Sequence, residues 1–171
     1  LNIFWGYRAA LDAGLPKPLV VCDKGFLRRP SIMFGMGDEW GNLAQWPDVP
    51  SRSINTEISE WQYTTSRVAL ILGQDPDDFS TKNAVSNYNK WKYDITELLT
   101  LNEWQVRYRP HPRTLLHAPV DVERPPPLMD DLRDVGLCVG INTGALVEAS
   151  ILGYPIHAAD DHSLVAPISV D

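Results

Sequence analysis

The second half of the chain alternates between short apolar runs and longer amphipathic stretches. Residues 67–74 ("RVALILGQ") form an apolar run that ends in polar residues, which is typical of a strand buried on both faces. Residues 87–102 ("NYNKWKYDITELLTLN") follow with a helical period. The apolar positions on one face of that predicted helix are Trp91, Ile95, Leu98 and Leu99.

The same alternation continues to the end of the chain. Strands are predicted in "WQVRYRP", "LCVGIN" and "PIHAAD", a short helix ends in "DLRDVG", and "TGALVEASILGY" is predicted to be a helix. A repeated order of strand, helix and strand is the pattern of a parallel, doubly wound sheet. We therefore expect an α/β protein with Rossmann-like parallel sheets.

The first part of the chain is less regular. Residues 1–14 predict a short apolar segment followed by a helix, residues 18–23 a buried strand, and the Gly- and Pro-rich residues 24–50 an extended loop region. Residues 51–66 are polar and are interpreted as a linker. We expect a first domain over residues 1–60 and a second domain over residues 61–171.

Composition limits the possible functions. The chain has 171 residues, 44% of them hydrophobic, and a net charge of −7, which argues against general nucleic-acid binding. Cys22 and Cys138 lie inside apolar runs without metal-ligand spacing, so buried free thiols in a reducing compartment are expected. No membrane span or signal peptide is visible, and we expect a cytoplasmic protein, in the bacterial host if a phage encodes it.

Three predicted strands of the second domain end in unusual polar residues. These are Gln74 with Asp75, then Arg109 to His111, then Asn142 to Gly144. Because a parallel sheet brings the carboxyl ends of its strands to one edge, the three sets are expected to meet at one crevice.

The helix that follows Asn142 has the features of an anion site. Asn142 or Thr143 is a plausible N-cap, and Gly144 lets a ligand approach the backbone closely. The free N–H groups of the first turn favour a phosphate, and Glu148, about one turn further along, is near enough for a sugar hydroxyl. The alternative is an ordinary capped helix with Glu148 on a solvated face.

His111 lies between two prolines in "VRYRPHPRT". The prolines stiffen the loop, which suits a fixed side-chain contact, and Arg109 and Arg113 beside it favour a phosphate. The alternative is a histidine satisfied by loop backbone, with arginines that pair with surface carboxylates. The remaining histidines, His117, His157 and His162, are expected to be ordinary, although "AADDHS" (158–163) also follows a strand end.

Acidic residues follow Gln74 closely. Asp75, Asp77 and Asp78 lack the ligand pattern of a calcium loop, so a turn and helix-start role is expected and no metal site is predicted. In the first domain, Asp23, Lys24, Arg28 and Arg29 are predicted just after a strand. They are interpreted as a basic wall for a phosphate or an acceptor, or as a solvated basic loop.

Three segments together resemble the capsule-polysaccharide type of glycosyltransferase. They are "VALILGQDPDD", "VRYRPHP" and "INTGALVEASILGYPI", which match a Gly-Gln strand end, a basic-x-His-Pro motif and a Ser/Thr-x-x-x-x-Glu-Ala helix. The chain also resembles bacteriophage proteins described as glycosyltransferases. The resemblance covers most of residues 14–167. It implies the GT-B type of fold, with an incomplete first domain (residues 1–60) on the acceptor side and a second domain (residues 61–171) that binds the nucleotide-sugar donor.

The resemblance implies roles for the residues that match it. Arg109 and His111 would contact the donor phosphates or nucleotide, Thr143 and Gly144 would bind phosphate, and Glu148 would hold the ribose hydroxyls. Gln74 would line the same pocket. The family implies a nucleotide-sugar co-substrate, no other cofactor and no catalytic metal, since basic residues and a helix dipole stabilise the leaving group.

The catalytic base is left open between Asp23, Asp38 and Glu39. The acceptor is also open: a surface glycan, or a modified base in phage DNA, for which Arg8 with the basic residues after residues 18–23 would supply a small groove. A sugar-nucleotide epimerase would share the fold. A nucleotide- or partner-binding module without catalysis is the alternative from another class, and a structural scaffold is the third.

Overall fold

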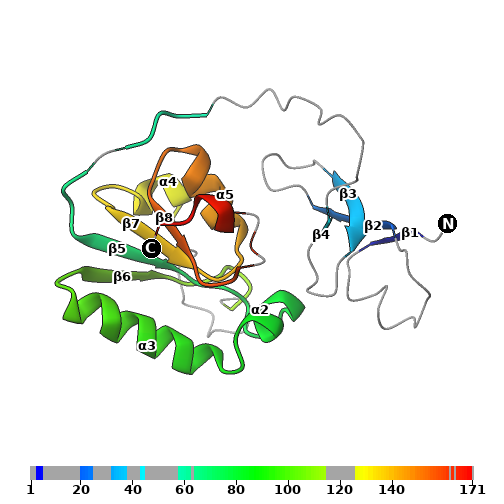
Figure 1. Ribbon diagram of the computed structural model, residues 1–171, viewed down its shortest axis with the longest axis horizontal. Helices are drawn as coiled ribbons and strands as arrows, with labels where there is room; N and C mark the ends of the chain where they lie inside the picture. Colours follow the sequence, from blue (N-terminus) through cyan, green and yellow to red (C-terminus); the bar gives the residue numbers. More distant parts are fainter. Residues whose placement is uncertain are drawn as a thin grey trace. The chain divides into compact units, whose positions relative to one another are not determined.

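The computed structural model divides the chain into two compact units, Leu1–Glu57 and Ile58–Asp171. In the first unit it describes four strands, and in the second unit residues 58–62, 64–114, 126–161, 163 and 165–170 (Figure 1). The assignment of the two units to an acceptor and a donor domain remains a prediction.

The second unit is built on a four-stranded parallel sheet. Its strands are β5 (Val68–Leu72), β6 (Gln105–Arg109), β7 (Leu137–Gly140) and β8 (Ile156–Ala158), and they lie in the order β6-β5-β7-β8. All three neighbouring pairs are parallel. The prediction of an α/β fold with a parallel sheet is therefore confirmed for this unit.

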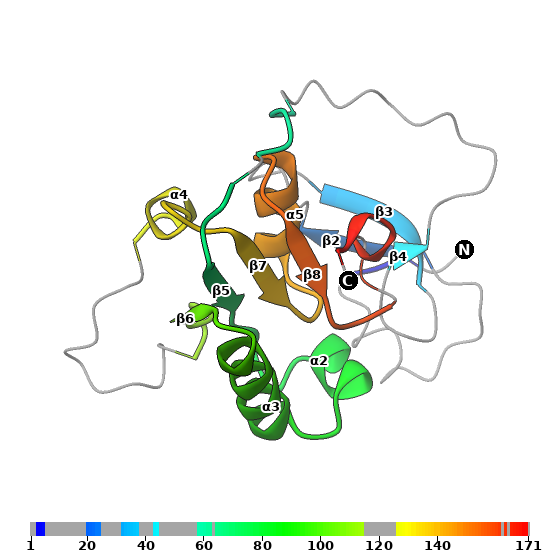
Figure 2. The ribbon, with the colours of Figure 1, turned by 60° about the vertical axis from the view of Figure 1, so that its left-hand side comes forward.

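Helices cover the two faces of this sheet, as Figures 1 and 2 show. The chain forms α2 (Phe79–Ala84) and α3 (Tyr88–Leu101) between β5 and β6, α4 (Leu128–Asp131) between β6 and β7, and α5 (Gly144–Ile151) between β7 and β8. A 3₁₀ turn, η1 (Ala166–Ile168), follows β8. The predicted helices over 87–102 and after Asn142 are present.

Alternate residues of β5 separate the core into two clusters. Leu70 and Leu72 pack in the cluster that contains residues of α4 and α5, while Ala69 and Ile71 pack with α3. Each of these four side chains is at most 2% exposed. Burial on both faces is the reason that this strand reads as a continuous apolar run rather than an alternating one.

The predicted apolar face of α3 is only partly buried. Leu99 is buried, and Trp91 and Ile95 pack partly buried against the core of that face. Leu98, in contrast, is 55% exposed, so its assignment to the buried face was wrong. Leu98 and Leu99 are adjacent, and neighbouring helix positions lie about 100° apart around the axis, so both cannot face the sheet.

The first unit forms a mixed sheet, which corrects the prediction of parallel sheets in both domains. Its strands β1 (Ile3–Trp5), β2 (Val20–Lys24), β3 (Ile32–Gly37) and β4 (Leu43–Ala44) lie in sequence order. Only β1 and β2 are parallel, and the two later pairs are antiparallel. Residues 25–31 and 38–42 are too short for the crossover of about a dozen residues that parallel pairing needs.

The predicted loop region over residues 24–50 therefore contains two strands. Asp23 and Lys24 do not follow a strand but are the last two residues of β2, paired with Met33 and Ile32. Side chains of this unit are outside the described residues, so the roles predicted for Asp23 and Lys24 stay predictions. The other predicted residues outside the described part are Arg8, Arg28, Arg29, Asp38, Glu39, His117 and His162.

The predicted linker over residues 51–66 is also partly corrected. The Ser59 N–H donates to Ile151 O and the Gln62 N–H to Gly153 O, and the Gln62 side chain donates to Leu152 O. Gly153 adopts φ +82°, and a Cβ there would lie 2.0 Å from Glu60 O. This segment is thus held against the C-terminal end of α5 rather than free of it.

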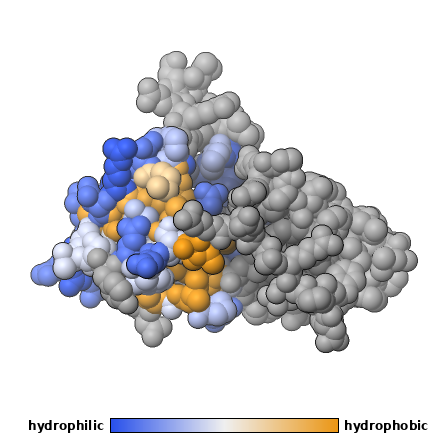
Figure 3. Space-filling view, turned by 90° about the horizontal axis from the view of Figure 1, so that it is seen from above, coloured by the Kyte–Doolittle hydropathy of each residue, from blue (hydrophilic) through white to orange (hydrophobic). Residues whose placement is uncertain are grey.

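The surface of the second unit is mixed. Among its exposed large apolar side chains are Ile58, Leu101 and Met129. On the face in Figure 3, apolar side chains reach the surface between hydrophilic ones. Within the described residues, no helix is both long and apolar enough to cross a membrane.

Candidate functional site

The connections of the second unit create a switch point between β5 and β7. From β5 the chain crosses to β6 on one side, and from β6 it returns past β5 to β7 and then to β8. The loops after β5 and β7 therefore leave in opposite directions from neighbouring strands. In open parallel sheets, ligands bind at the carboxyl ends of the strands at such a point.

Gln74 joins the two strand ends at the switch point. Its Nε2 donates to Asn142 O at 2.9 Å, and its Oε1 accepts from the Asn142 N–H at 3.0 Å. Nε2 also donates to the Ser80 hydroxyl, at 3.2 Å. Gln74 is only 3% exposed. Its amide is thus occupied within the protein, and it fixes the loop after β7 rather than presenting a free group to a ligand.

The N-terminus of α5 opens at the same place. Thr143 is the N-cap, and its hydroxyl accepts from the Ala145 N–H at 3.4 Å, while Leu146 N–H donates to Thr143 O. No described residue accepts from the N–H of Gly144, the first residue of the helix. The helix dipole and this open N–H make the end of α5 favourable for an anion.

His111 follows β6 and is held in one tautomer. Its Nδ1 accepts from the Arg113 N–H at 3.2 Å, so in the neutral imidazole the proton lies on Nε2, which becomes a donor. Burial lowers the pKa of His111, and the Asp75 carboxylate acts in the opposite direction. The side chain is therefore a neutral N–H donor near pH 7.

Arg113 supplies an exposed cation beside His111. Its Nη1 lies 3.8 Å from Asp75 Oδ2, and its side chain is 64% exposed. A pair this long and exposed contributes little to stability. The guanidinium can therefore turn to an anionic ligand at small cost.

Arg109 is used differently. Its Nη1 donates to the carboxylate of Asp131 and to Pro126 O at 2.7 Å, and its side chain is 13% exposed. These contacts tie the end of β6 to α4 and to the segment that leads into it. They correspond to the alternative interpretation, in which the arginine pairs with a carboxylate of the protein.

Asp160 is a buried carboxylate at the same edge, just after β8. It is 8% exposed, and its Oδ2 lies 3.4 Å from the Asn142 side-chain Nδ2. In the sequence, the only indication that Asp160 belongs to the site was that residues 158–163 follow a fourth predicted strand. Glu148, by contrast, is exposed on α5, as the predicted sugar contact requires and as an ordinary solvated residue also would be.

The acidic residues after Gln74 form a turn. Asp75 Oδ1 accepts from the Asp77 N–H at 3.0 Å, and the Asp78 N–H donates to Asp75 O at 3.1 Å. Asp77 also pairs with Lys82 at 2.9 Å. These bonds agree with the predicted turn. In the described part of the chain, no three His, Cys, Asp or Glu residues are grouped in a way that could hold a metal ion.

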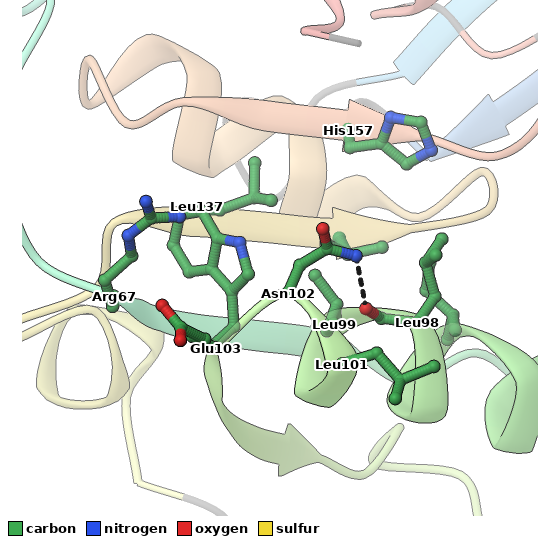
Figure 4. Close-up of a pocket in the computed structure, with 11 residues that line it drawn as sticks. Arg67, Leu98, Leu99, Leu101, Asn102, Glu103, Leu137 and His157 are labelled. Atoms are coloured by element: carbon green, nitrogen blue, oxygen red, sulfur yellow. Dashed lines mark hydrogen bonds between the residues drawn. The ribbon is translucent and has the colours of Figure 1, made fainter.

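A separate hollow of about 600 Å³ lies on the α3 side of the sheet (Figure 4). Its lining includes Arg67 and Trp104, which stack at 5.2 Å, and Leu137 at the start of β7. These residues lie at the amino ends of the strands. Of the polar residues considered as site candidates in the sequence, only His157 lines it. The polar groups at the strand ends lie elsewhere, and we take the carboxyl edge as the site.

Comparison with known proteins identifies the fold. No family model and no curated protein matches the chain. Among the solved structures that resemble it are Thermosulfurimonas dismutans KpsC, described as a beta Kdo 2,7 transferase, and the same organism's KpsC described as a beta Kdo 2,4 transferase. Identity is 13% to each, and the TM-scores are 0.57 and 0.58. The matches cover 91% of this chain and 63% and 67% of the two KpsC chains.

These matches show that the chain has a glycosyltransferase-like α/β fold. At such identity they establish the fold and leave the donor and the acceptor open. The chain spans about two thirds of the length of the two transferases. The chemistry must therefore be argued from the carboxyl edge itself.

Proposed function

We propose that the second unit binds the phosphate of a nucleotide-activated sugar at its carboxyl edge, and that the protein is a glycosyltransferase. One observation carries the proposal. The open N-terminus of α5 and the neutral donor His111 belong to the loops of two strands that flank β5, in a fold shared with Kdo transferases.

The contacts can be assigned to individual groups. The Gly144 N–H and the α5 dipole would face the phosphate, His111 would donate through Nε2, and Arg113 would supply the positive charge. Gln74 would position the loop that carries Asn142. Fixed dipoles and donors of this kind stabilise the charge that develops on a leaving phosphate.

Two parts of the proposal go further than the described contacts. Glu148 is proposed to hold a ribose hydroxyl, because it is exposed one turn into α5. The acceptor is proposed to be a glycan, and because both similar structures are described as Kdo transferases, Kdo is the first sugar to test. The catalytic base is proposed to come from the first unit.

The test is calorimetric titration with the mono- and diphosphates of the four common nucleosides. Arg113→Ala and His111→Ala are each expected to weaken the tightest of these by about tenfold or more, since a hydrogen bond to a charged group contributes about 1.5–3 kcal/mol. Arg133→Ala is the matched control. Arg133 is also exposed, pairs with Asp130 at 3.0 Å, and precedes β7 at the opposite end of the strand.

The outcomes separate transfer from simple binding. Nucleotide affinity that falls in both variants and stays unchanged in the Arg133 control supports the site, and no binding by folded wild-type protein contradicts it. Transfer is then tested by incubating the protein with a nucleotide sugar and a glycan or DNA acceptor and measuring release of the nucleotide. Binding without turnover would favour the nucleotide-binding module.

A further inference from the structure

Two tyrosines form a hydroxyl pair at the edge where His111 lies. Tyr108 is the next-to-last residue of β6, and Tyr88 is the first residue of α3. Their hydroxyl oxygens are 3.3 Å apart. Tyr88 is buried, whereas Tyr108 is 41% exposed. The pair therefore connects the interior of the unit to its surface.

Gly73 makes room for the Tyr108 hydroxyl. A Cβ at Gly73 would lie 2.6 Å from that hydroxyl and 3.0 Å from the backbone nitrogen of His111. Both atoms thus gather around the residue that follows β5. The hydroxyl lies beside the loop that carries the proposed phosphate donor, although sequence reasoning did not single it out.

The direction of the hydrogen bonds follows from their partners. The Gln74 N–H donates to the Tyr88 oxygen at 3.0 Å. Among the described residues, the only acceptor within reach of the buried Tyr88 proton is the Tyr108 oxygen. The Tyr88 hydroxyl thus accepts from Gln74 and donates to Tyr108. The Tyr108 oxygen is then an acceptor within the protein, and its own proton is left for a group outside the protein.

The surroundings favour an anionic acceptor for that proton. Burial raises the pKa of Tyr108, so its hydroxyl keeps its proton at neutral pH. The Lys92 ammonium lies 4.9 Å from the centre of the Tyr108 ring, and no described carboxylate pairs with it. Its positive charge is therefore available at this end of β6.

We propose that the Tyr108 hydroxyl donates a hydrogen bond to a phosphate oxygen of the bound nucleotide, and that Tyr88 positions it. This inference rests on the proposed function and extends its phosphate site to Tyr108, which the motifs in the sequence did not single out. Three neutral or basic donors would then meet the phosphate from the β6 side: Tyr108, His111 and Arg113.

The test compares Tyr108→Phe with Tyr93→Phe, using the nucleotide that binds wild-type protein most tightly. Tyr93 lies on α3 and is 67% exposed, so Tyr93→Phe controls for removal of a phenol oxygen. We expect Tyr108→Phe to weaken the diphosphate by about tenfold, as for a hydrogen bond to a charged group, and Tyr93→Phe to leave it unchanged. The corresponding nucleoside without phosphate should bind both variants and wild type equally.

A second readout is the ¹³Cζ chemical shift of Tyr108, which should move when the diphosphate is added. Unchanged diphosphate affinity in Tyr108→Phe, with wild-type binding intact, would overturn the inference and leave the proposed function standing. An equal loss for the nucleoside would also overturn it, because the contact would not be to phosphate. If wild-type protein bound no nucleotide at all, the proposed function itself would fail.

Discussion

Replacing Gln74 by Leu should destabilise the second unit without adding a charge or changing the side-chain volume much. Gln74 is 3% exposed, and its amide makes two hydrogen bonds with the backbone of Asn142. Leu would leave the Asn142 N–H and carbonyl without these partners. Each of these hydrogen bonds contributes about 0.5–1.5 kcal/mol, so we expect a total loss of about 1–3 kcal/mol.

The assay is urea unfolding followed by far-UV circular dichroism. The midpoint should fall while the slope of free energy against urea stays the same, which marks lost stability rather than a changed unfolded state. Gln62→Leu is the control, because Gln62 is exposed and its side chain makes one hydrogen bond, to Leu152 O. The reasoning is refuted if Gln74→Leu unfolds at the wild-type midpoint, or if both variants lose equal stability.

Three further outcomes follow from the described contacts. Gly73→Ala should cost about 1–3 kcal/mol and change the amide shifts around Tyr108 and His111, since its Cβ would overlap the Tyr108 hydroxyl; wild-type shifts and stability would contradict the close approach. Burial lowers the pKa of His111 below its usual 6.5, so the unfolded chain takes up this proton first, and the His111 contribution to stability is present above pH 6.5 and lost as the pH falls below it. Urea midpoints of wild type should therefore fall more between pH 7.5 and 5 than those of His111→Gln, and equal falls would argue against it. Burial raises the pKa of Cys138 to about 12, so in a Cys22→Ala background the thiol should react with a disulfide reagent only after unfolding, and fast reaction of the native protein would show that it is accessible.

Much of the second unit could be predicted because its signals are local. The apolar run over residues 67–74 reflects a strand that is buried on both faces. The helical period over residues 87–102 reflects a helix that is buried on one face. Their alternation predicts parallel connections. The convergence of Gln74, His111 and Asn142 at one edge follows from topology alone.

The rest depended on information that is not local. Gln74 was predicted as a pocket residue, but its partner Asn142 lies 68 positions away, and only the folded sheet shows that they pair. Arg109 was predicted as a phosphate contact from its charge, its place beside His111 and the family resemblance. The competing carboxylate of Asp131 becomes visible only when α4 returns past β6.

Glycine content explains the error in the first unit. The stretch "IMFGMG" carries two glycines among its apolar residues, so it was interpreted as a loop, yet it forms β3. Pairing with β2 and β4 on either side compensates for the weak strand preference of glycine. The local sequence pattern does not show which strands will lie beside this segment.

The most direct test of the central claim is the amide signal of Gly144 in a ¹⁵N-labelled protein during titration with the tightest-binding nucleoside diphosphate. If the phosphate binds at the N-terminus of α5, the Gly144 amide shifts with a saturating dependence that gives the calorimetric affinity, while the Gly153 amide beyond the other end of the helix stays in place. A nucleotide that binds with the Gly144 amide unmoved would contradict the claim.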